Sequence, residues 1–367
     1  MTKYKVETIL IYRQNSLPYQ GIASRTEIYR RYIESNDHQI DYIICPRPER
    51  EFNGVNYSFY KKGTSFGIFK NFYEELNIYK SLKRIIEKDK KYVIKIIDDS
   101  GLVVLLNKIL SRKFIRENFY IIYCVHGYQL NFTGRKMIAF NELIDIVVYL
   151  TEKSYRHNKI IHNVLTPRAK VIHNGIDNNI FKPIDIGKKK LIKNKLGLKH
   201  NEKIFLWCSQ DRSKKGIDLT LNFWKKVIRQ HPNANLLIVG IDRKIEMKGV
   251  IHIGKVPNLE LPKYYQVSNV YLFTSLCYEG FPLSLTEALK CGCYCIASDY
   301  GGVSEVLGNG EYGKLIKKPH FIEEWIDAID EYFESPKKFK ELPHDKYSSE
   351  QWNLEMNKLI LEIKAEF

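Results

Sequence analysis

The chain has 367 residues, with 58 Lys+Arg against 42 Asp+Glu and a formal net charge of +16. At roughly 150 residues per domain, this length predicts two domains. Hydrophobic residues make up 44% of the chain and charged residues 27%, which excludes a disordered protein. No apolar run reaches the roughly 18–20 residues of a membrane span, and charges interrupt the first apolar stretch, which excludes a secretory signal there. We expect a soluble protein of the cytoplasm.

Positive charge is concentrated in the first part of the chain. Residues 1–200 carry 36 basic and 19 acidic side chains, whereas residues 201–367 carry 22 and 23. An excess of this size predicts that the first half faces something anionic, such as nucleic acid, a membrane surface or an acidic substrate. A general drift toward Lys and Asn in an AT-rich genome explains the same count without any partner.

Short β-branched and aromatic runs alternate with helical patterns such as 26–34, 72–88, 219–231 and 321–334. Continuous apolar runs of this length are typical of strands buried on both faces of a parallel sheet. The alternation therefore predicts an α/β chain. The expected strands are Val6–Tyr12, Ile40–Cys45, Tyr92–Ile97, Phe119–Val125, Asp145–Leu150, Lys203–Cys208, Asn235–Gly240, Val250–Gly254, Asn269–Thr274 and Cys293–Ser298.

A break in this alternation lies near residues 175–202. Turn residues at 174–177 are followed by Pro183 and by a short basic helix that begins at Lys188. We expect two doubly wound parallel-sheet domains, 1–178 and 179–347. Residues 348–367 form an amphipathic helix in this interpretation, with Trp352, Met356, Leu359 and Ile363 on one stripe.

The seven cysteines are an odd number and lie mostly inside apolar runs, which indicates small buried side chains in a reducing compartment. Cys291, Cys293 and Cys295 are close in sequence. Strand alternation leaves only two of them on one face, and no second pair lies nearby to complete a tetrahedral site. We expect no metal there.

The most informative segment is 278–289, which follows the expected strand 269–274. Pro282 suits the first turn of a helix, so the free N–H groups around Leu283 and Ser284 would form an anion site suited to a diphosphate. Glu279 precedes this helix and Glu287 lies on it, so the two carboxylates could bind hydroxyl groups on either side of a diphosphate. A capped helix with two solvated glutamates is the alternative.

The segment around Glu279 and Glu287 resembles a motif of a known enzyme family. Glu279 and Glu287 form an E-x7-E pattern within EGFPLSLTEALKCG, which resembles the retaining glycosyltransferases of the group 1 (family 4) type. Three further segments resemble that family in the same order: VIHNGID at 171–177, KKGID at 214–218 and SDYGGVSEVL at 298–307. The resemblance implies a GT-B fold, in which two Rossmann-like domains face each other across a cleft and residues 348–367 cross back to the first domain.

The resemblance also implies roles for the residues of the second domain. Glu287 would bind the ribose hydroxyls of a nucleotide sugar, and Glu279 the hydroxyls of the transferred sugar. Lys215 would neutralise the diphosphate, whose other contacts would be the backbone N–H groups of the segment Phe281, Pro282, Leu283 and Ser284, with Pro282 excepted. The family implies action without a metal or other cofactor, because cationic groups and a helix N-terminus stabilise the leaving diphosphate.

One position departs from the family pattern. The family carries an Arg five residues before the Lys of Lys-Gly, and this chain has Gln210 there. Arg212 or Lys214 supplies the second cation in one interpretation, and we favour Arg212. In the other, Gln210 donates neutral hydrogen bonds to the diphosphate.

Two candidate residues lie in the first half. His126 follows the strand 119–125, at the edge where ligands bind in doubly wound sheets, and resembles the family histidine that approaches the donor sugar. An ordinary histidine at a strand end is the alternative. Gly21 resembles one glycine of the family's Gly-Gly loop, which closes over donor and acceptor. We count His126, Glu279 and Lys215 as candidate catalytic residues.

The function expected from this resemblance is transfer of a hexose from a nucleotide sugar, UDP most often, with retained anomeric configuration. The acceptor would be a saccharide or lipid-linked acceptor in bacterial surface glycan synthesis. The charge excess of the first half fits a first domain that rests on an anionic membrane or reaches for an anionic acceptor, with 80–95 and 108–116 as contacts. A nucleic-acid-binding protein is the alternative, but the sequence contains none of the motifs typical of that class. A nucleotide-sugar epimerase or phosphorylase on the same scaffold, or a dehydrogenase without G-x-G-x-x-G, fits the patterns less well.

Overall fold

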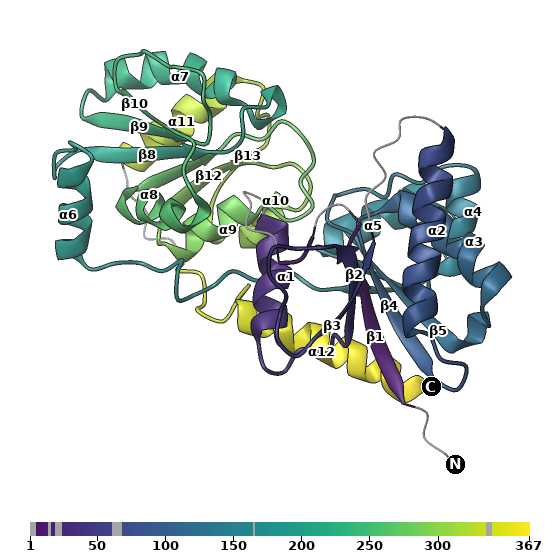
Figure 1. Cartoon of the computed structure of the whole chain (residues 1–367). Coiled ribbons are helices and arrows are strands. Elements are labelled where there is room, and N and C mark those ends of the chain that lie inside the picture. The colour runs from purple at the N-terminus through teal and green to yellow at the C-terminus, as the bar shows by residue number, and fades with distance from the viewer. Residues whose placement is uncertain (1–4, 14–15, 19–23, 61–67, 164–165, 335–339) are drawn as a thin grey trace. The chain divides into compact units, whose positions relative to one another are not determined.

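A computed structural model describes residues 5–13, 16–18, 24–60, 68–163, 166–334 and 340–367. The chain divides into two compact units, Met1–His173 with Glu350–Phe367, and Asn174–Ser349. Each contains one parallel sheet covered by helices, so the two α/β sheets predicted from the alternation are confirmed (Figure 1).

The sheet of the first unit has seven strands in the order β3-β2-β1-β4-β5-β6-β7. The order reverses between β1 and β4, which makes this pair the point where a doubly wound sheet binds ligands. The strands are β1 Val6–Ile11, β2 Tyr42–Pro46, β3 Asn56–Tyr60, β4 Lys91–Ile97, β5 Phe119–Cys124, β6 Ile146–Tyr149 and β7 Arg168–Val171. The helices are α1 Ser24–Glu34, α2 Ile68–Ile85, α3 Ser100–Lys113, α4 Arg135–Leu143, α5 Glu152–Ile161 and α12 Ser349–Glu366.

The sheet of the second unit has six strands in the order β10-β9-β8-β11-β12-β13. Here the reversal lies between β8 and β11, which pair in parallel with Phe205 opposite Val270. The strands are β8 Lys203–Cys208, β9 Ala234–Val239, β10 Val250–Gly254, β11 Val270–Phe273, β12 Tyr294–Ser298 and β13 Gly313–Ile316. The helices are α6 Ile186–Lys195, α7 Ile217–Gln230, α8 Leu261–Val267, α9 Leu283–Lys290, α10 Val303–Val306 and α11 Ile322–Glu334.

Helices cover both faces of each sheet, as the apolar strands require. In the first unit, one core packs α2, α3 and α4 against the sheet. In the second unit, α7 and α11 pack on one face, with the ring of Phe223 stacked on Trp325 at a centroid distance of 5.5 Å. α8 and α9 contact each other and the sheet through β8, β11 and β12.

The last helix, α12, buries the stripe that its sequence predicts. Trp352, Met356, Leu359 and Ile363 are each at most 4% exposed. Within the first unit, the Trp352 ring meets Tyr29 of α1 edge-on, at a centroid distance of 5.5 Å. The helix therefore contributes aromatic and aliphatic side chains to the core of the first unit.

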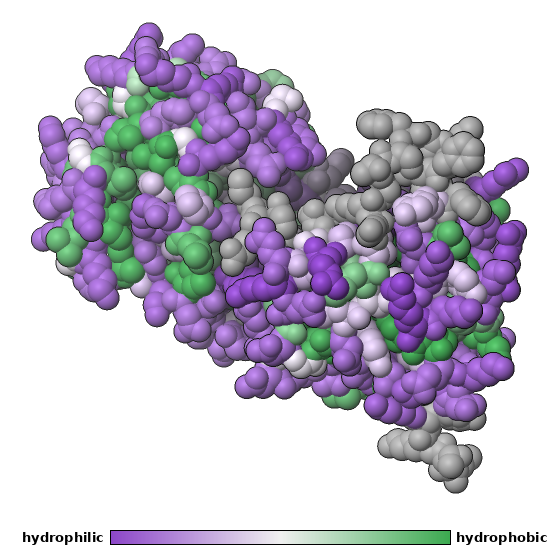
Figure 2. Space-filling view, in the orientation of Figure 1, coloured by the Kyte–Doolittle hydropathy of each residue, from purple (hydrophilic) through white to green (hydrophobic). Residues whose placement is uncertain are grey.

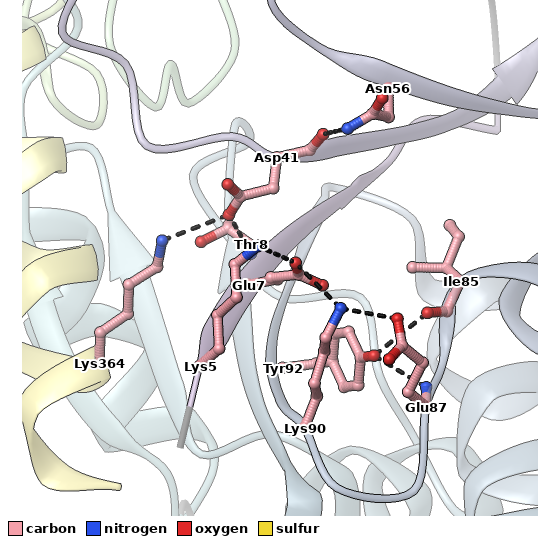
Figure 3. Close-up of polar contacts among 10 residues, drawn as sticks. All are labelled: Lys5, Glu7, Thr8, Asp41, Asn56, Ile85, Glu87, Lys90, Tyr92 and Lys364. Carbon is pink, nitrogen blue, oxygen red and sulfur yellow. Dashed lines mark hydrogen bonds and ion pairs between the residues drawn. The ribbon is translucent and has the colours of Figure 1, made fainter. Parts of the chain in front are cut away.

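Ion pairs connect side chains at the amino-terminal edge of the sheet of the first unit (Figure 3). Lys364 of α12 pairs with Asp41 at 3.3 Å. Glu7, buried on β1, accepts from Lys5 at 3.0 Å and from Lys90 at 3.4 Å. These lysines compensate carboxylates within the unit.

In the described part of the chain, no helix is long and apolar enough to cross a membrane. The face in Figure 2 is mostly hydrophilic, and the hydrophobic residues visible on it form separate small patches.

Candidate functional site at the β8–β11 edge

The loop after β8 is fixed against the end of β11. Gly216 has φ +76°, and a Cβ there would lie 2.1 Å from the carbonyl oxygen of Thr274. The Thr274 hydroxyl donates to the carbonyl oxygen of Lys215 at 3.0 Å and accepts from Trp207 Nε1 at 3.0 Å. Only glycine fits this close approach of two backbones. The Lys-Gly segment singled out in the sequence therefore places Lys215 directly beside the carboxyl end of β11.

The loop after β11 brings Glu279 to Lys215. Their side chains pair at 2.5 Å, with the Lys215 side chain 22% exposed and that of Glu279 17% exposed. The Glu279 carbonyl oxygen accepts from Gly302 N at 2.8 Å, and Glu279 bridges to Gly301. Three of the predicted segments, 214–218, 278–289 and 298–307, thus meet at one edge of the sheet.

Helix α9 begins where the sequence predicts it, with Pro282 at the N-cap position. The first intrahelical bonds run from Leu285 N and Thr286 N to the Pro282 carbonyl oxygen, each at 3.1 Å. Leu283 N and Ser284 N precede these donors, so the first turn can offer them to an anion. The side chain of Phe281 is buried against Tyr347, which makes it a packing residue here.

Glu287 projects from α9 into a largely buried position, with 8% of its surface exposed. Its Oε2 atom accepts from the hydroxyl of Tyr265 on α8 at 3.1 Å. Tyr265 is fully buried, and burial raises the pKa of its hydroxyl well above the ordinary value, so it stays a donor at neutral pH. The tyrosine therefore orients the carboxylate predicted to bind ribose.

The side chains expected to contact the diphosphate from the β8 loop differ in exposure. Gln210, Arg212 and Lys214 are exposed, and Lys215 is half-buried. Arg243, in the loop after β9, pairs with Asp218 at 2.6 Å and with Asp211 at 3.3 Å. Sequence reasoning did not single out Arg243, whose position after a strand is its one local signal.

The two candidate residues of the first half belong to the first unit. His126 follows β5 in the first unit, with its ring 6.0 Å from that of Tyr29. Gly21 lies outside the described residues. Across the described residues, no group of three or more His, Cys, Asp and Glu side chains could hold a metal ion.

Sequence reasoning also missed Ser275, Thr274 and Tyr265. Ser275 and Thr274 directly follow β11, and this placement at a strand end could have identified them. Tyr265 lies on a different helix from Glu287, 22 residues earlier in the chain. No local pattern connects the two.

Part of the sequence is similar to known glycosyl transferases. Residues 188–347 match the family model described as "Glycosyl transferases group 1". N-acetyl-alpha-D-glucosaminyl L-malate synthase of Bacillus anthracis is 25% identical over 225 residues, which are 56% of this chain and 56% of that protein. Matches to the first curated relatives span about half the length of those proteins.

Solved structures match nearly the whole chain. Sucrose-phosphate synthase from Thermosynechococcus elongatus has a TM-score of 0.76 at 17% identity, covering 99% of this chain and 100% of that one. The Anabaena protein HepE, solved in complex with UDP, has a TM-score of 0.74 at 14% identity, covering 98% and 100%. At these identities the match establishes the fold alone, which is the GT-B fold that the sequence resemblance implied.

Proposed function

We propose that this chain, whose residues 188–347 match the model of the group 1 glycosyl transferases, transfers a sugar from a nucleoside diphosphate sugar to a hydroxyl acceptor. The observation that carries the proposal is the 2.5 Å pair between Lys215 and Glu279 at the β8–β11 reversal. The two residues stand 64 positions apart in sequence, and the fold brings them to the edge where such sheets bind ligands.

The resemblance assigns each residue its role, and the chemistry of the reaction fits these assignments. In the reaction, the bond between the sugar C1 and the diphosphate oxygen breaks, and the oxygen of the acceptor hydroxyl bonds to C1. The hydroxyl proton passes to the departing diphosphate. Negative charge then accumulates on the leaving diphosphate, which Lys215 and the first turn of α9 stabilise. Glu287 binds the ribose, Glu279 binds the hydroxyls of the transferred sugar, and Arg212 supplies the second cation.

The family resemblance supports a more specific reaction. We propose that the donor is a UDP-sugar, because HepE binds UDP in its solved complex. Transfer retains the anomeric configuration, with His126 near the donor sugar, and proceeds without a metal. The acceptor is a saccharide or lipid-linked acceptor of a bacterial surface glycan.

A panel of nucleotide sugars tests the proposal. We expect slow, enzyme-dependent hydrolysis of one of them, unchanged by EDTA. Transfer to an acceptor should give a glycoside with the anomeric proton coupling of the donor. Glu287→Ala should reduce nucleoside diphosphate binding by about 10²-fold, because the ribose loses its carboxylate partner. Inversion at C1 would exclude the retaining assignment, and equal binding by Glu287→Ala would exclude its ribose role.

Membrane association of the first unit is the second part of the proposal. The last turns of α2 and α3 carry Lys83, Arg84, Arg112 and Lys113, all exposed. These helices lead into β4 and β5, which are paired neighbours, so the four cations lie near one edge of the sheet. Lys95 and Lys90, expected among the contacts, are respectively fully buried and paired with carboxylates. We therefore limit the predicted contacts to the helix ends.

Seven lysines counted with the first half, at 182–199, belong to the second unit, and most of them lie on or beside α6. Vesicles containing phosphatidylserine distinguish the two surfaces. We expect binding that is lost at high salt and reduced by changing the four helix-end cations to Gln. The matched variant, with exposed Lys188, Lys190 and Lys195 of α6 and exposed Lys199 shortly after it changed to Gln, should bind like the wild type. Salt-insensitive binding, or loss only in the α6 variant, would contradict this assignment.

A further inference from the structure

Within the described part of the chain, one oxygen of the Glu279 carboxylate accepts every hydrogen bond that this side chain receives. Oε1 accepts from Lys215 Nζ at 2.5 Å and from the Ser275 hydroxyl at 2.5 Å, with the Cys277 thiol at 3.8 Å. Oε2 accepts no hydrogen bond from any residue in the described part of the chain. Within the described part of the chain, Oε1 of Glu279 is therefore hydrogen-bonded and Oε2 is not.

Ser275 is itself held firmly. It is 1% exposed and directly follows Thr274 at the end of β11. Its carbonyl oxygen accepts from the hydroxyl of Ser298 at 2.5 Å, and Ser298 is fully buried at the end of β12. A short side chain fixed between two strand ends has little freedom to move, so its hydroxyl is a rigid donor.

Lys215 does not hold the Glu279 carboxylate as rigidly as Ser275 does. Its ammonium sits on a flexible four-carbon stem, and under the proposed function it turns toward the diphosphate when the donor binds. Ser275 has no such second task. Its hydroxyl keeps Oε1 satisfied while Lys215 is engaged elsewhere.

We propose that Ser275 is a positioning residue of the donor site, which binds Oε1 of Glu279 and so leaves Oε2 to the hydroxyls of the transferred sugar. The inference rests on the proposed function and deepens it. Its consequence is selective, because the sugar contact exists only in the intact nucleotide sugar. Ser275 should matter for binding the nucleotide sugar and not for binding the corresponding nucleoside diphosphate.

Titration calorimetry with three ligand pairs tests the inference: UDP with UDP-glucose, GDP with GDP-mannose, and ADP with ADP-glucose. For the pair that the wild type binds, Ser275→Ala should raise the Kd of the nucleotide sugar about tenfold, the effect of losing one hydrogen bond to a charged group. The Kd of the nucleoside diphosphate should stay within about twofold. Ser275→Cys, which keeps a weak donor, should recover part of the loss.

Cys277→Ala is the matched control, because that thiol lies 3.8 Å from the same carboxylate oxygen and 3.5 Å from the Ser275 hydroxyl, and its removal leaves the hydrogen bond between Ser275 and Glu279 in place. Its Kd values should equal those of the wild type. Equal weakening of both ligands by Ser275→Ala would show a merely structural serine, and unchanged binding would show no role; either overturns the inference while the proposed function stands. A wild type that binds none of the six ligands overturns the proposed function, and the inference with it.

Discussion

Lys215→Ala is expected to lower kcat/KM for the nucleotide sugar by about 10²–10³-fold, the usual cost of removing one preorganised charge from a developing anion. Two effects add in this variant. The diphosphate loses a half-buried cation, and Glu279 is left as an unpaired carboxylate beside it. The second effect is repulsive and strong at this depth, because solvent screens partly buried charges poorly. Steady-state kinetics of donor hydrolysis measure the change.

Lys214→Ala provides the matched control for this prediction. Lys214 is the adjacent residue, carries the same charge and is exposed. Long-range attraction of an anionic donor predicts similar losses in both variants, whereas direct stabilisation predicts a large loss for Lys215 alone. Lys215→Arg should regain part of the activity, because it keeps the charge but changes its geometry. Similar kinetics for the two alanine variants would rule out the direct role of Lys215.

The sequence predicted the central strands of both sheets and missed three that lie at sheet edges. The missed strands are β3, β7 and β13, each with one strand neighbour. In β7, three of the four residues, Arg168–Lys170, are exposed, so no apolar run indicates a strand. An edge strand needs only one partner and one covered face, and its sequence is accordingly less constrained.

The site was predictable where function requires particular residues at short spacing. Glu279, Glu287 and the start of α9 lie within one segment. Gly216 was also recognisable, because the close approach of two backbones at this position requires a glycine, and the glycine is visible in the sequence. Tyr265 could not be found in this way, because its contact with Glu287 depends on how α8 and α9 pack. Lys95 was misinterpreted as a surface charge, because a lysine at a strand position gives no sign of which layer covers it.

The surroundings of Lys95 explain how a lysine occupies the interior of the first unit. It is completely buried on β4, with its Nζ atom 2.9 Å from Met356 Sδ. The ammonium also lies 4.9 Å from the ring centroid of Tyr29 and 5.3 Å from that of Trp352. Ring faces offset part of the cost of burying a cation, but no carboxylate pairs with Lys95 among the described residues. Burial therefore lowers the pKa of Lys95.

Lys95→Met is consequently expected to stabilise the protein, by about 1–3 kcal/mol at pH 7, because an apolar chain of similar length replaces the buried amine. The advantage depends on pH. Above the unfolded pKa near 10.5, the lysine is neutral in both the folded and the unfolded state. The difference in the free energy of unfolding between the variant and the wild type, called the gap below, is smallest there. As the pH falls below that value, the unfolded chain binds a proton that the folded chain resists, so the wild type loses up to about 1.4 kcal/mol per pH unit until the folded pKa is reached.

Urea denaturation between pH 6 and 10.5 measures this gap, with exposed Lys113→Met as the control for removing a positive charge from the same unit. We expect the Lys113 variant to show little change and the Lys95 variant to gain most at low pH. A gap independent of pH would mean that the folded protein holds Lys95 protonated throughout, with the three aromatic rings around it fully compensating its burial. In that case Trp352→Ala should uncover the missing pH dependence, because it removes one ring of the cage and leaves the amine buried.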